Sequence, residues 1–142
     1  MNRDHLRTVA TVAIFTLLGP PLAGALVVIG LIWESVLSEP AFLWMGWYGA
    51  IYAFLPGLVP ALVGGLVAAW LSRKLANPWL WLLACAGLGA LGSAAGGLIG
   101  GYSPAAISQA GFLGLAMMAG AVTGLVCGGF AVGLRPRPYG SA

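Results

Sequence analysis

Four long stretches without a charged residue are the strongest constraint on what this chain can fold into. They cover approximately residues 8–33, 47–71, 79–101 and 110–134. A helix needs about 20 consecutive apolar residues to cross a hydrocarbon layer of about 30 Å. The stretches are continuous rather than alternating, which favours helices over the short strands of a membrane barrel. The sequence therefore predicts an all-α integral membrane protein whose four transmembrane helices form an antiparallel bundle.

The composition excludes a soluble protein. Only 6% of the 142 residues are charged, whereas 61% are hydrophobic. A soluble domain carries about 25% charged residues, because its surface must be hydrated. The connections between the four stretches are short, so residues 1–142 are expected to form a single membrane domain.

The distribution of basic residues predicts the orientation of the chain. Lysine and arginine gather on the cytoplasmic side of a membrane protein. Here they occur as three pairs, which lie before the first span, after the second and after the fourth. With four spans these three regions share one side, so both termini are predicted to be cytoplasmic. The pairs are Arg3 and Arg7, Arg73 and Lys74, and Arg135 and Arg137.

Aromatic residues near the span ends agree with this arrangement. Trp and Tyr prefer the level of the lipid headgroups. One predicted belt contains Trp33, Trp44 and Trp47, with Tyr48, Tyr52 and Tyr102, and the other contains Trp70, Trp79 and Trp81.

The first span also resembles a signal peptide, with Ala23-Gly24-Ala25 as a cleavage site. Its apolar run continues for 26 residues from Thr8, so we interpret it as a retained span, with cleavage as the open alternative.

Glycines recur at four-residue spacing in three of the spans. The chain has 23 glycines, and residues four apart share a helix face. Such faces let two helix backbones approach closely, which favours helix association in lipid. They serve either packing within the four-helix bundle or contact with a partner protein. The helix-packing candidates are Gly92, Gly96, Gly100, Gly120, Gly124 and Gly128.

Four prolines lie inside predicted spans: Pro20 and Pro21 in the first, and Pro56 and Pro60 in the second. A proline inside a helix removes one amide donor and clashes with the carbonyl four residues earlier, which bends the helix. Interrupted helices form substrate sites in many transporters. The four prolines are therefore candidates for a solute site, although a bend can also serve packing alone.

The spans lack the residues that most membrane chemistry requires. They contain no ionisable side chain of the kind that marks ion and proton pathways, which argues against a proton-coupled exporter. Their polar side chains include Thr16, Ser93 and Thr123, which have no base at the same depth. Cys85 and Cys127 are interpreted as buried thiols. We therefore expect no enzymatic activity, no catalytic residue, no cofactor or metal site and no nucleic-acid binding.

Two functions fit this pattern. The first is a non-enzymatic accessory, assembly or scaffold subunit that acts through helix contacts with other membrane proteins or with itself. The alternative is a small oligomeric transporter or channel for a neutral or apolar solute, with its site at the proline kinks. Five arginines against one lysine, with abundant alanine and glycine, suggest a bacterial chain, and hence a multi-pass protein of the inner membrane.

Overall fold

The computed structural model describes residues 3–33, 39, 44–75, 77–99 and 109–133. Its long elements are the four helices α1 (Arg3–Leu31), α3 (Met45–Lys74), α4 (Pro78–Ile99) and α5 (Gln109–Val132). Each is long and apolar enough to cross a membrane, which confirms the predicted number and type of elements.

Two helices extend past their apolar stretches at one end of the bundle. The helix α1 begins at Arg3 and α3 continues to Lys74, so both include charged residues. Hydropathy identifies only the apolar segment of a helix, whereas the helical backbone hydrogen bonds continue beyond that segment. Here Arg73 Nη2 donates a hydrogen bond of 3.0 Å to Thr8 Oγ1, which links the two helices. We call this end, where α1 begins and α3 ends, the basic end.

The helix α4 begins at the same end, shortly after α3 ends. The backbone amide of Trp79 donates a 2.9 Å hydrogen bond to the Asn77 side chain, as at a helix N-cap. Pro78 is the first helical residue, where its missing amide hydrogen removes no helical bond. The sequence Asn-Pro therefore starts α4.

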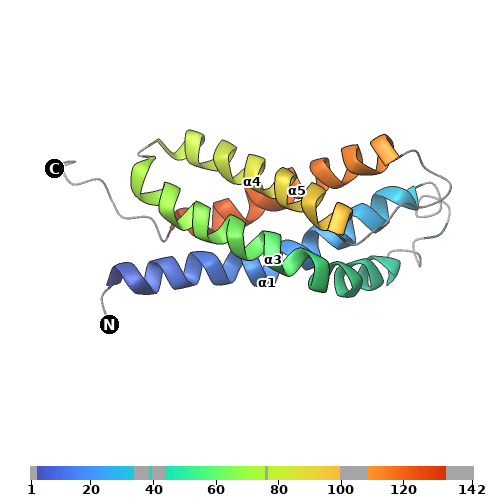
Figure 1. Cartoon of the computed structure of the whole chain (residues 1–142), viewed down its shortest axis with the longest axis horizontal. Helices are drawn as coiled ribbons and strands as arrows, with labels where there is room; N and C mark the ends of the chain where they lie inside the picture. The colour runs from blue at the N-terminus through green and yellow to red at the C-terminus, as the bar shows by residue number, and fades with distance from the viewer. Residues whose placement is uncertain (1–2, 34–38, 40–43, 76, 100–108, 134–142) are drawn as a thin grey trace.

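The helices form a four-membered ring in which α1 and α4 each pack mainly against α3 and α5 (Figure 1). The glycine contacts show antiparallel neighbours. Gly24 of α1 lies against Gly49 of α3, and Gly65 lies against Val12, nearer the basic end. The helices α1 and α3 thus run in opposite directions.

The most tightly packed part of the interior lies toward the basic end. Its buried residues come from all four helices: Phe15, Ala68, Trp81, Cys85, Cys127 and Ala131. The two cysteines are buried and are not joined in a disulfide, as expected from the sequence.

Trp81 corrects the prediction of an aromatic belt. Its side chain is 0% exposed and belongs to this core, whereas Trp79 is 73% exposed. The indole Nε1–H of Trp81 donates a 3.2 Å hydrogen bond to the backbone carbonyl of Gly128. Because Gly128 has no side chain, the indole can reach the α5 backbone. A tryptophan near a span end is therefore buried here rather than anchored at the interface.

The outer surface of the ring is apolar. Leucine, valine and methionine side chains project outward from the helices, with Leu55, Leu83 and Met118 among the most exposed. In water this surface would favour aggregation, whereas hydrocarbon solvates it. Lipid is therefore the environment that fits the outside of the bundle.

Candidate functional site: a cavity at the proline kinks

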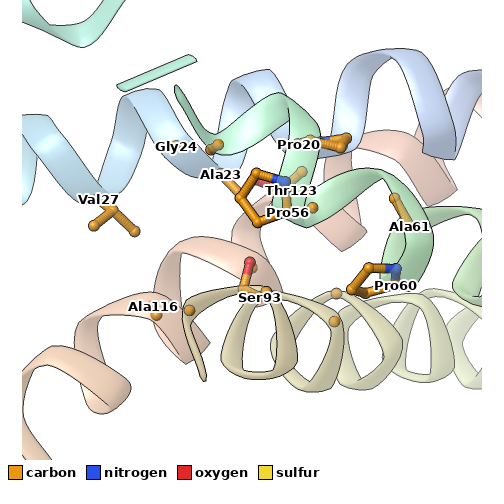
Figure 2. Close-up of a pocket in the computed structure, with 18 of the residues that line it drawn as sticks. Pro20, Ala23, Gly24, Val27, Pro56, Pro60, Ala61, Ser93, Ala116 and Thr123 are labelled. Atoms are coloured by element: carbon orange, nitrogen blue, oxygen red, sulfur yellow. The ribbon is translucent and has the colours of Figure 1, made fainter. Parts of the chain in front are cut away.

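A cavity of about 220 Å³ lies between the four helices. Its lining consists of uncharged residues, mostly glycine, alanine, proline and other apolar types. Figure 2 shows how side chains from all four helices surround it, including Pro20, Pro56, Ser93 and Thr123. The site is therefore a shared interior space and belongs to no single helix.

The cavity begins where the packed core ends. Phe15 and Cys127 belong to the core and also line the cavity, so the core closes the cavity toward the basic end. The lining continues along α1 as far as Leu31. At about 1.5 Å per helical residue, the distance from Phe15 to Leu31 is about 24 Å. The space is therefore slim and extends away from the basic end.

Three of the four candidate prolines line this cavity. Pro20 from α1 meets Pro56 and Pro60 from α3, whereas Pro21 lies beside Trp47 in a shallow depression on the outside. The helices α1 and α3 continue through their prolines, and both change direction near the middle of the bundle (Figure 1). The sequence pattern thus places three prolines at one site, although it could not show which of the four faces outward.

The prolines face glycines on neighbouring helices. A Cβ atom added to Gly57 would lie 2.9 Å from the Cβ of Pro20. On α4, a Cβ atom added to Gly92 would lie 3.9 Å from the Cβ of Pro60. The glycine at each of these positions leaves room for a proline ring or for the cavity next to it.

Backbone carbonyl groups without a helical donor lie at this site, and the Pro56 carbonyl is one of them. Pro60 has no amide hydrogen, so the carbonyl of Pro56 lacks its helical donor four residues later. The Pro56 oxygen faces α4, since it lies 3.8 Å from the position of a Cβ atom added to Gly96. A hydrogen-bond acceptor is therefore directed toward the helix that forms the opposite wall.

Three hydroxyl-bearing residues line the cavity, namely Tyr52, Ser93 and Thr123, and Tyr52 is 65% exposed. Ser93 points from α4 into the space between the helices (Figure 2). Thr123 lines the cavity from α5, is 4% exposed, and its Oγ1 has no hydrogen-bond partner among the described residues. Thr16 differs, because its Oγ1 donates a 2.8 Å hydrogen bond to the Val12 carbonyl. The sequence identified Thr16, Ser93 and Thr123 as intramembrane hydroxyls but could not show that Thr123 is the one buried without a partner.

The candidate glycines are used mainly inside the bundle. A methyl group at Gly120 would overlap the carbonyl oxygen of Gly89, and one at Gly124 would overlap that of Cys85. Gly128 faces the Cys85 side chain, Gly92 and Gly96 face α3, and Gly100 lies outside the described residues. The five of these glycines that the structure describes let the four helices approach one another.

The described residues contain no group of three His, Cys, Asp or Glu side chains that could hold a metal ion. The chain matches no protein-family model, and no curated protein or solved structure is significantly similar to it.

Proposed function

We propose that this chain is a small solute-binding membrane protein of the transporter or channel class, and that its solute is neutral and largely apolar. The observation that carries the proposal is the meeting of Pro20, Pro56 and Pro60 in one cavity lined by all four helices. The helices α1 and α3 bend at these prolines without being interrupted, and a space near the middle of the bundle is where many transporters bind their substrate.

The lining determines the class of solute. A charged solute would lose its hydration in this cavity and would find no countercharge, at a cost of many kcal/mol. An apolar solute loses nothing comparable and gains contacts with the walls. A dry apolar cavity of roughly 150 Å³ holds a molecule of benzene size, whereas drug-sized ligands occupy about 300–1,000 Å³. A volume of about 220 Å³ therefore favours a solute slightly larger than benzene.

The proposed setting is the inner membrane of a bacterium, with both termini in the cytoplasm. The grouping of Arg7, Arg73 and Lys74 toward one end of the bundle supports this orientation. In this setting the cavity lies in the outer half of the membrane. Because four helices enclose little volume, we further propose that transport requires self-association.

A photolabel tests solute binding. The purified chain in lipid nanodiscs is irradiated with a medium-chain alcohol that carries a diazirine, and labelling is followed against probe concentration. Saturable labelling is expected, because the cavity has a finite volume. The variant Gly92→Leu should fill the cavity and abolish the saturable component.

The matched control is Gly87→Leu on the same helix. Gly87 is exposed and has open space above it, so its substitution should leave labelling unchanged. Labelling that never saturates, or that falls equally in both variants, would refute solute binding in the cavity.

Transport itself is tested with butyramide, an uncharged amide with an apolar tail. Proteoliposomes loaded with butyramide should release it faster than protein-free vesicles loaded with the same amide. Replacement of Pro20, Pro56 and Pro60 together by alanine should return the release rate to that of the protein-free vesicles. Equal release from vesicles with and without the chain would restrict the proposal to binding.

A second proposal is an accessory or scaffold role through contacts with other membrane helices. The observation that favours it is that Gly87 and Gly129 are exposed, with open space where a side chain would be. Small residues on a lipid-facing surface permit close helix approach. Gly129→Leu should then disrupt a native complex that copurifies in nanodiscs, without affecting insertion. Gly124→Leu cannot make this distinction, because it also disturbs contacts inside the bundle.

A further inference from the structure

Thr123 is an anomaly among the threonines buried in the helices. In a transmembrane helix a threonine hydroxyl ordinarily donates to a carbonyl one turn earlier. Thr11 does so, with a 2.9 Å hydrogen bond to the Arg7 carbonyl, and Thr16 bonds the Val12 carbonyl. Thr123 is as buried as Thr11, yet its Oγ1 makes no hydrogen bond within the described residues.

An unpaired hydroxyl in an apolar interior is unfavourable. A buried polar group without a partner costs about 1–3 kcal/mol, and lipid supplies no water to replace the partner. The Thr123 Oγ1 is itself fully buried, but the residue lines the cavity, so rotation of its side chain would bring the hydroxyl to a partner from outside the chain. The Ser93 hydroxyl and the Pro56 carbonyl lie on the walls of the same space. The cavity thus has a hydroxyl donor and a carbonyl acceptor on its walls, which are otherwise apolar except for Tyr52.

We infer that Thr123 is the recognition residue of the cavity, and that the solute carries one uncharged hydrogen-bonding group, such as a hydroxyl or an amide, on a slim apolar body. This inference rests on the proposed solute-binding function and specifies its ligand. The slim, extended lining fits a single chain or one ring with a substituent. A plain hydrocarbon, including the tail of a lipid, can fill the cavity but leaves the Thr123 hydroxyl without a hydrogen-bond partner.

The test is a competition between two molecules of the same size. The diazirine photolabel described above is displaced by 1-heptanol or by octane, and each competitor is expressed as its mole fraction in the nanodisc lipid. In the unsubstituted chain heptanol should compete about fivefold better than octane, because one net hydrogen bond changes affinity by about three- to tenfold. Octane reports on occupation by a hydrocarbon tail.

Variants assign the preference to Thr123. Thr123→Val keeps the shape of the side chain and should reduce the preference for heptanol to about onefold. Thr123→Ser restores the hydroxyl and should restore most of the preference. Thr16→Val is the matched control, because the Thr16 hydroxyl already bonds within its own helix, and it should leave the preference unchanged.

The outcomes separate the inference from the function on which it rests. Saturable labelling that heptanol and octane displace equally would overturn the inference and leave solute binding intact, with water as the partner of Thr123. A preference for heptanol that survives Thr123→Val would also overturn it, since another group would then recognise the solute. A lack of saturable labelling would remove the proposed function as well.

Discussion

At the scale of single residues, Trp81 and Trp79 show how two neighbouring tryptophans take different roles. Trp81 is buried in the core and its indole donates a hydrogen bond to the Gly128 carbonyl, whereas Trp79 projects outward. Trp81→Phe removes this hydrogen bond and part of a fully buried ring. We expect it to lower the free energy of unfolding by about 1–3 kcal/mol. Thermal unfolding in detergent measures the effect, with Trp79→Phe as the control that should change little.

A second residue-scale prediction concerns the closest helix contact. A methyl group at Gly120 overlaps the carbonyl oxygen of Gly89, so Gly120→Ala must push α4 and α5 apart. Overpacking of this kind costs about 1–3 kcal/mol of stability. Gly129→Ala lies on the same helix with open space above it and should be neutral or slightly stabilising. Equal melting temperatures for the two variants would contradict the proposed packing of α4 against α5.

The sequence could predict much of this, but not the pairing of individual side chains. Hydropathy alone locates the helices, because a span must be uncharged over its whole length. It cannot separate Trp81 from Trp79, since both are tryptophans near the same span end. Nor can it separate Thr123 from Thr16, because the difference is whether a hydroxyl reaches a carbonyl, and only the packed helices determine that.

At the scale of helices, the prolines of α3 link backbone chemistry to the cavity. Pro60→Ala returns an amide donor to the Pro56 carbonyl and allows α3 to straighten. We expect the affinity for the photolabel to fall about tenfold, because a straighter α3 moves its wall of the cavity, while the melting temperature does not fall. The measurement is the saturation curve in nanodiscs.

Pro78→Ala is the control for this helix-scale prediction. Pro78 is the first residue of α4, where a proline causes no bend. Its replacement should leave the saturation curve unchanged. A higher affinity of the Pro60→Ala variant for the photolabel would mean that the bend does not create the binding space.

At the scale of the whole molecule, the orientation has a direct test. Both native cysteines are buried, so a cysteine introduced at an exposed position reports its side of the membrane. Asn77 lies at the basic end and Glu39 lies between α1 and α3, and both are exposed. An impermeant maleimide should label Glu39→Cys in intact cells and Asn77→Cys only after permeabilisation. The reverse pattern would invert the proposed orientation.

The most direct test of the central proposal is to map where the photolabel attaches. After irradiation of the chain in native-lipid nanodiscs, mass spectrometry of peptides identifies the modified residues. If a solute occupies the cavity, saturable adducts should form on its lining, including Phe15, Pro60 and Cys127. Adducts confined to the outer surface at Leu55, Leu83 and Met118, rising in proportion to probe concentration, would show that the probe binds only as lipid does.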